Sequence, residues 1–388
     1  MHDVEKLPLW LAHLWDEANN PLKDAEARLD KQLHLAEALA EYLAVAFLAT
    51  VLAEPHSVDP SGRGRIASAA TRTFGKRAAF GDWVSLVRSG FGGGPALVSQ
   101  TLGVTVEPTF EEQSAVGEFS RSVTESPPER IRLTYFLDQL VALRNERVHG
   151  RIVGSYCATL VPLLAPALDA VLTAMPAIVD RPMVYVEHAR PLGDEGGDVV
   201  LYFRPLTGDG RRPLVSQFTT NDTMGRGWCG DRVVFWDRVS DAATPIPDWL
   251  IRFDKTAHHM RLCQGVTSVE DDMSYHSRQR DVVPEVDTGL AVPFWAAMKA
   301  LEAPRAPASR MQSDDPHAPG DALYTTAFRR AQGSDGVITV DERVLLDTIA
   351  HGLGLSDRDR RRLEARAHDS VLTWSGELPV IRPRPAQG

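Results

Sequence analysis

The sequence predicts a multidomain α+β protein with a helical bundle first, a small antiparallel β domain second and a small helical domain last. Three observations support this prediction. Apolar residues recur at helical spacing through residues 1–178, short β-rich runs separated by glycine-rich turns fill residues 179–302, and a stretch rich in proline, alanine and serine at 303–320 is typical of a linker. Residues 321–388 then form the last domain, and 388 residues suffice for two or three domains.

Four or five helices are expected in the N-terminal region, which predicts an up-and-down bundle. The most apolar run is Ala38–Ala53, where interspersed glutamates indicate a buried helix and not a membrane span. The glycines at positions 62, 64 and 75 predict a loop before the third helix. The expected helices are Leu9–Trp15, a long helix capped by Asp24 that runs to about Ala53, Phe80–Val87, a helix leading to Arg144, and 152–175 with interruptions at Pro162 and Pro166.

The chain changes character near Pro182, where β-branched and aromatic residues begin to alternate with polar ones. One face of a small antiparallel sheet can be filled by Val200, Tyr202, Val233, Phe235, Trp249 and Ile251. The expected strands are Met183–Glu187, Asp198–Arg204, Leu214–Phe218, Asp231–Trp236 and Trp249–Phe253, and a helix is expected at Phe294–Leu301.

The helix that ends near residue 149 holds the polar residues with the clearest chemistry. Asn145 and His149 are four apart and share a helix face, while Arg144 lies about 100° around the axis from Asn145. Gly150 follows directly, and glycine commonly ends a helix. An arginine, an amide and a histidine in this arrangement suit a phosphate group, but a solvated helix end explains the same residues. Apolar residues at helical spacing are expected on the buried side of this helix, namely Leu137, Leu140, Val141 and Val148.

Arg144, Asn145, three further residues and His149 match the arginine–histidine motif of the HEPN superfamily of helical domains. The resemblance covers roughly residues 20–175. It implies a metal-independent endoribonuclease, often part of a prokaryotic defence or toxin system, in which a symmetric dimer brings two motifs together. Arg144 and His149 would then be catalytic and Asn145 would orient the phosphate or the histidine. Other members of that superfamily are non-catalytic, so a dimerisation or sensor scaffold that binds a partner protein or nucleotide is the alternative.

A basic stretch between residues 61 and 90 lies in the same region and can contact an RNA backbone, although a solvated basic loop is an equally good interpretation. The net charge of −10 disfavours non-specific coating of nucleic acid, because phosphate binding depends on clustered cations. The cations expected to bind RNA are Arg63, Arg65, Arg72, Lys76, Arg77 and Arg147.

The sequence predicts no cofactor and no metal site. Three widely spaced cysteines, Cys157, Cys229 and Cys263, fit neither a disulfide framework nor a cysteine metal site. The acidic and histidine residues between His258 and His276 match no recognised ligand spacing. The N-terminus lacks the basic start and apolar core of a signal peptide, so a cytoplasmic protein without a membrane span is expected.

The last domain contains Asp335-Gly336, Ile338 and Glu342, which match the second half of an EF-hand loop. Ala331 and Gly333 stand at the first and third ligand positions and offer no side-chain oxygen, which argues against calcium binding. Residues 320–370 resemble the tellurite-resistance-B-like helical domains, with a Leu-Gly-Leu-Ser turn at 353–356. That resemblance implies a docking or sensing module. A partner protein can bind through this module or through the β region.

Overall fold

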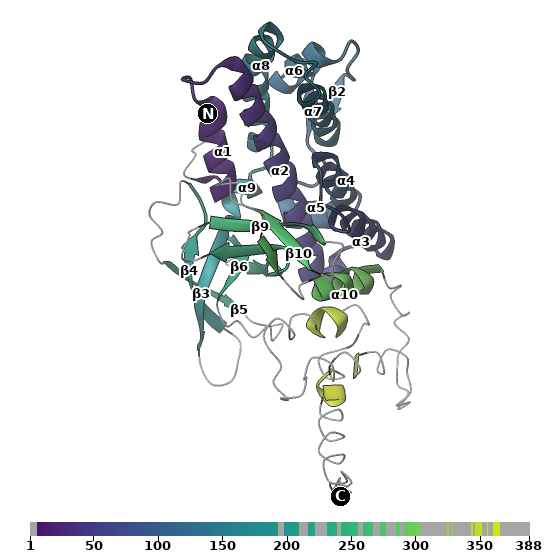
Figure 1. Cartoon of the computed structure of the whole chain (residues 1–388). Coiled ribbons are helices and arrows are strands. Elements are labelled where there is room, and N and C mark those ends of the chain that lie inside the picture. Colours follow the sequence, from purple (N-terminus) through teal and green to yellow (C-terminus); the bar gives the residue numbers. More distant parts are fainter. Residues whose placement is uncertain are drawn as a thin grey trace, which may run out of the picture. The chain divides into compact units, whose positions relative to one another are not determined.

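The chain is a mixed helix and sheet protein with small antiparallel sheets, as the sequence predicts (Figure 1). It forms two compact units, Met1–Glu302 and Ala303–Gly388. The computed structural model describes residues 6–192, 198–208, 216–221, 231–238, 242–254, 259–266, 272–276, 285–287 and 291–302 of the first unit, and 324–325, 328, 343, 346–350, 355 and 360–364 of the second.

Helices make up most of the described first unit. Helices predicted near the start, in the long apolar run, before Arg144 and after it are all confirmed. The helices are α1 (Leu9–Asn19), α2 (Ala25–Ala53), the short 3₁₀ helix η2 (Pro55–Ser57), α3 (Pro60–Phe74), α4 (Phe80–Phe91), α5 (Pro95–Leu102), α6 (Ala115–Val123), α7 (Leu133–Val148), α8 (Ser155–Thr173), α9 (Ala177–Asp180) and α10 (Ala291–Glu302).

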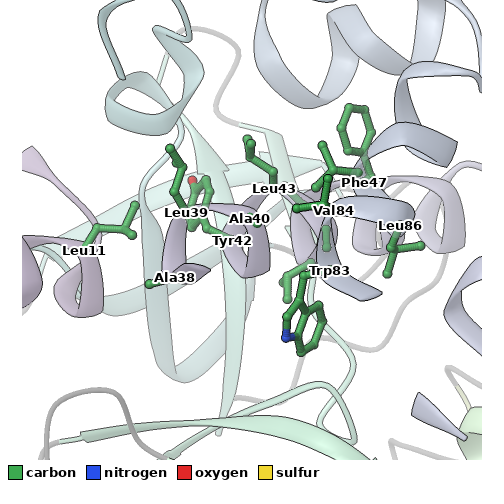
Figure 2. Packing of buried hydrophobic residues seen from close by; sticks show 14 of the residues in the cluster. Leu11, Ala38, Leu39, Ala40, Tyr42, Leu43, Phe47, Trp83, Val84 and Leu86 are labelled. Carbon is green, nitrogen blue, oxygen red and sulfur yellow. The ribbon is translucent and has the colours of Figure 1, made fainter. Parts of the chain in front are cut away.

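Helix α2 is the centre of the first unit. The carboxylate of Asp24 accepts a hydrogen bond from the backbone N–H of Ala27 at 2.7 Å, the N-cap that the sequence predicts. From Leu35 to Val51 every residue of α2 is buried, and Figure 2 shows its apolar side chains beside those of α4. By length and composition alone, α2 and α8 could each cross a membrane. The most apolar 18 residues of α2, however, are 100% buried inside the protein, as in a core helix.

Helix α3 replaces the loop that the glycines predicted. Asp59 caps it by accepting a hydrogen bond from the backbone N–H of Gly62 at 2.7 Å, and Pro60 occupies the first turn, where its missing N–H costs nothing. Ile66 and Phe74 are fully buried on its inner face. Burial of this face therefore outweighs the low helix propensity of the glycines, and the loop prediction was wrong.

Helix α8 is continuous from Ser155 to Thr173, with both Pro162 and Pro166 inside it. The predicted interruption is therefore absent. The prolines are exposed on the outer side of the helix, while its inner face, including Leu160 and Leu164, is fully buried. Packing of that inner face compensates for the backbone hydrogen bonds that proline cannot donate.

The described strands of the first unit form three antiparallel sheets. Strands β1 (Thr109–Glu111) and β2 (Arg130–Arg132) pair across helix α6 and precede α7. A five-stranded sheet has the order β5-β4-β3-β6-β7, and a four-stranded sheet has the order β11-β10-β9-β8. The larger sheets consist of β3 (Met183–Leu192), β4 (Asp198–Pro205), β5 (Ser216–Asn221), β6 (Arg232–Asp237), β7 (Ala242–Pro245), β8 (Ile251–Asp254), β9 (His259–Val266), β10 (Met273–His276) and β11 (Glu285–Asp287).

The predicted strands are present, but they do not share one sheet face. Ile251 lies in β8 of the four-stranded sheet, whereas Val233 and Phe235 lie in β6 of the five-stranded sheet and face the helical core. Val200 and Tyr202 of β4 are only half-buried. Short strands and their alternation are visible in a sequence, but the pairing that assigns them to sheets depends on contacts between distant residues.

The helices and one face of each larger sheet share a hydrophobic core, and the other face of the five-stranded sheet buries a second cluster that includes Val184, Leu201 and Phe203. The ring of Tyr42 in α2 contacts that of Phe235 in β6 edge-to-face, with centroids 5.8 Å apart, and Phe74 of α3 contacts Phe294 of α10 at 5.3 Å. The change from helices to strands occurs after α9, near residue 179, as the sequence predicts. Both parts belong to one compact unit, however, and not to two separate domains. The second unit begins at Ala303, where the predicted linker starts.

In the second unit, the described residues include a small core and a charged cluster beside it. Tyr324 and Leu346 are buried in that core. Arg360 is paired with Asp347, yet burial dominates and raises the pKa of the Asp347 carboxyl to about 6. The EF-hand-like loop, most of the Leu-Gly-Leu-Ser turn and the linker lie outside the described residues.

Candidate functional site

The predicted motif lies at the C-terminal end of α7, and Gly150 ends the helix as expected. Gly150 has φ +70°, the left-handed conformation that glycine adopts without strain. Its N–H donates to the carbonyl of Arg147 at 3.0 Å, and the N–H of Arg151 donates to the carbonyl of Glu146 at 2.9 Å. These two bonds form a Schellman motif, which fixes His149 as the residue that caps α7.

The three motif residues differ in burial. Asn145 and His149, which share a helix face, are both exposed. Arg144 is half-buried, and its guanidinium Nη2 lies 3.7 Å from Oε2 of Glu37 on α2, a carboxylate that is itself only 7% exposed. Arg144 therefore lies between the bundle interior and solvent, close to the exposed pair.

A second arginine fastens the loop that follows His149. Arg147 donates from Nε to Asp30 at 2.8 Å and from Nη2 to Glu26 at 3.0 Å, both on α2, and from Nη1 to the backbone carbonyl of Ile152 at 2.8 Å. The other carboxylate oxygen of Glu26 accepts from the backbone N–H of Gly154 at 2.8 Å. Both ends of the loop between α7 and α8 are thus tied to the N-terminal part of α2.

These contacts give Arg147 a structural role in place of the RNA-binding role expected from the sequence. The hydrogen bond to Asp30 raises the pKa of Arg147, the bond to Glu26 adds to this shift, and desolvation opposes it. The side chain is 16% exposed, and its three nitrogens are occupied by partners on α2 and in the loop. An RNA phosphate would have to break this network to reach it.

One cation of the basic stretch is buried, and others are on the surface. Arg63 is 2% exposed and inside the fold, so it cannot contact an RNA backbone without local unfolding. Arg65 donates to the hydroxyl of Ser61 and to the backbone carbonyl of Gly92, both at 2.6 Å. Arg72 and Arg77 are exposed.

The basic stretch contacts the motif helix through α4, where Arg88 pairs with Asp138 of α7 at 2.6 Å. Lys76 pairs with Asp82 at 3.0 Å, and a methyl group built on the neighbouring Gly81 would lie 3.7 Å from Val141 of α7. Val141 is one turn before Asn145. The RNA-binding role of Lys76 and Arg77 stays a prediction.

Three exposed apolar side chains lie close to His149 in the sequence. Val148, expected on the buried side of α7, is 69% exposed, and Val153 and Tyr156 are 56% and 41% exposed. These three residues, which we call the Val148 patch, lie within nine positions of sequence that include His149. The helical spacing predicted that Val148 is buried, and this prediction was wrong. Among the described residues, no element packs against that side of the last turn of α7.

The sequence analysis missed the acidic partners of the two arginines. Glu26, Asp30 and Glu37 lie four and seven residues apart on α2, which places them within about 40° of one another around the helix axis. Arg144 and Arg147 are three apart on α7 and face that acidic stripe. The spacing of the carboxylates on α2 and of the two arginines on α7 is the sequence signal from which the packing of α2 against α7 could have been predicted.

Within the described residues, no group of three or more histidine, cysteine, aspartate or glutamate side chains is placed to hold a metal ion. His258 and Asp271 of the weak sequence pattern lie outside them. Cys157 and Cys263 are free and buried. The chain matched no protein-family model, and searches of curated proteins and of solved structures found no match either.

Proposed function

We propose that this protein is a metal-independent endoribonuclease of the HEPN type, with its site at the end of α7. The observation that supports it best is an exposed histidine at a fixed helix cap, one turn from an exposed amide, on the helix that also carries the half-buried Arg144. His149 is exposed to solvent, and a salt-bridge network holds the loop that follows it in place.

The proposed reaction is attack of a ribose 2′-hydroxyl oxygen on the adjacent phosphorus. The bond from phosphorus to the 5′-oxygen breaks, and the products are a 2′,3′-cyclic phosphate and a 5′-hydroxyl. One proton leaves the attacking hydroxyl and one reaches the leaving oxygen, so the reaction needs both a base and an acid. The imidazole of His149 suits either role.

Arg144 would bind the non-bridging phosphate oxygens as negative charge accumulates on them. A guanidinium can donate two parallel hydrogen bonds to such oxygens, which a lysine cannot. Its present partner Glu37 is 3.7 Å away, which is longer than the 2.8 Å between Arg147 and Asp30. The looser pair leaves Arg144 able to turn towards a phosphate, and Asn145 lies where an amide can orient that group.

The motif of one chain contains one histidine, whereas the reaction needs both a base and an acid. The proposal therefore includes a two-fold dimer that brings two His149 side chains to one phosphate. The Val148 patch provides the surface for it. Val148, Val153 and Tyr156 expose apolar area around the motif, and burial of that area against a second copy would be favourable.

The alternative function is a non-catalytic scaffold that dimerises or binds a partner protein or nucleotide. The observation that favours it is the acidic stripe on α2, which provides carboxylate partners for both Arg144 and Arg147. In this alternative both arginines join α2 to α7, and His149 has no chemical task.

Arg144 variants separate the two functions. The nuclease predicts that Arg144→Ala loses RNA cleavage and that Arg144→Lys recovers only part of it, because lysine keeps the charge but not the planar fork. Arg151→Ala, seven residues on, is the matched control and should cut RNA normally. If full-length protein cuts no RNA and Arg144→Ala changes only its thermal stability, the scaffold replaces the nuclease.

A further inference from the structure

The five-stranded sheet has one region of surface that the helices do not cover. Along β4, Val199, Leu201 and Phe203 are buried on one face, while Val200 and Tyr202 are half-buried on the other. The exposed side chains of neighbouring strands line the same face as Tyr202. We call this surface the open face and define it by His188, Arg190, Val200, Tyr202, Gln217 and Thr219.

A β-bulge places a histidine on this face. The register between β3 and β4 shifts between Val186 and His188, so that His188 stands opposite Tyr202. The two rings stack with centroids 4.2 Å apart and planes inclined by 16°. Bulges redirect side chains and are frequent beside functional sites.

The outer side of the His188 ring has no neighbouring strand in the described part of the sheet. Strand β6 pairs with β3 only from Met183 to Val186, so the second half of β3 continues without it. His188 itself is exposed, whereas Tyr202 beneath it is half-buried. The exposed side chain of His188 is therefore accessible to a third flat ring that can extend the stack.

The polar groups around the stack suit a nucleic acid strand. Arg190 is exposed two residues beyond His188 on the same face, and Gln217 stands exposed opposite Tyr202 on β5. The carboxylate of Glu187 is paired with Arg204. A cation that can reach a phosphate, an amide that can donate and accept, and an aromatic stack are the components of single-strand binding surfaces.

We propose that the open face binds single-stranded RNA, with one nucleobase stacked on His188 and a backbone phosphate near Arg190. The choice of RNA rests on the proposed nuclease function, and the open face would hold an unpaired strand for that activity. Stacking on a ring tolerates every base, so binding should depend little on sequence.

Binding is measured with full-length protein that carries His149→Ala, so that the RNA stays intact. The probe is an unstructured oligouridine with one 2-aminopurine, followed by fluorescence anisotropy and by quenching, which reports stacking. His188→Ala should weaken binding about tenfold and abolish the quenching, as expected for the loss of one stacked base. His188→Phe keeps a flat ring at this position and should restore most of the binding and of the quenching.

Two further variants complete the test. Arg190→Gln should lower the slope of log affinity against log salt concentration by about 0.7, the contribution of one phosphate contact on a single strand. His13→Ala removes an exposed histidine on α1 and should leave binding unchanged.

The outcomes distinguish this inference from the nuclease proposal. Wild-type-like binding and quenching in His188→Ala overturn the inference, even if the protein cuts RNA through His149. Loss of binding in His188→Ala supports it, even if the wild-type protein cuts no RNA. Absence of oligouridine binding to the His149→Ala protein would also overturn it.

Discussion

Two arginines one turn apart on α7 have different surroundings. Arg147 is enclosed by Asp30, Glu26 and the carbonyl of Ile152, at distances of 2.8 to 3.0 Å. Arg144 has one carboxylate partner at 3.7 Å and a more exposed side chain. The first geometry is typical of a structural ion pair, and the second leaves the guanidinium available to a ligand.

The structural role of Arg147 is tested by its stability effect. Arg147→Ala should lower the free energy of unfolding by about 1–2 kcal/mol, because several charge-assisted bonds are lost while the partner carboxylates remain nearly half exposed. Thermal or denaturant unfolding measures this. Arg151→Ala removes a surface pair with Glu146 and should cost less than about 0.5 kcal/mol. Equal, negligible effects of both substitutions would refute the structural role.

At the residue scale, the sequence identified the motif residues and the capping glycine but not their partners. Asn145 and His149 share a face because four residues nearly complete a helical turn, and Gly150 ends α7 for a local reason. The contact of Arg144 with Glu37 and the burial of Arg63 depend on which helices pack together. Local spacing does not contain that information.

At the element scale, helix α3 shows where residue propensities mislead. Three glycines suggested a loop, yet Asp59 caps a helix whose inner face is buried. The lengths of α2 and α4 were easier to predict, because their apolar residues repeat over several turns. Helices α5 and α6 are eight and nine residues long, too short for periodicity to distinguish them from loops.

Two glycines, one inside α3 and one at the end of α7, provide a matched test of these two helices. Gly64 lies inside α3 with open space around its Cα, so Gly64→Ala should stabilise the protein by about 0.5–1 kcal/mol. Gly150 also has open space but a φ of +70°, so Gly150→Ala should destabilise by about 1–2 kcal/mol. Chemical denaturation measures both. Destabilisation by Gly64→Ala would mean that residues 60–74 do not form the helix described.

At the scale of the whole molecule, residues 1–302 fold around α2 as one unit. A fragment that ends near residue 178 would expose the α2 face that packs on Phe235, so residues 1–302 are the shortest fragment suited to experiments. The sequence showed where helices give way to strands. It did not show that both share a core, because the contact between Tyr42 and Phe235 joins residues far apart in the chain.

Self-association is predicted through the Val148 patch. Sedimentation equilibrium should show a dimer for the wild-type protein and a monomer for Val148→Asp, because a buried carboxylate without a partner strongly disfavours the interface. Leu22→Asp is the control, since Leu22 is 92% exposed and lies outside the patch. A wild-type monomer at micromolar concentration, or a Val148→Asp dimer, would contradict this assembly.

Cleavage of RNA by wild-type protein and by His149→Ala, both in EDTA, tests the central claim most directly. We expect the wild-type protein to cut and to leave 2′,3′-cyclic phosphate ends, identified by mass spectrometry of the products. His149→Ala, purified identically, should be at least about 100-fold slower, since proton transfer by a positioned side chain contributes that much or more. Its fold should be intact, because an exposed side chain at the end of α7 contributes little packing. Equal cleavage by both proteins, or wild-type cleavage that EDTA abolishes, would contradict the account.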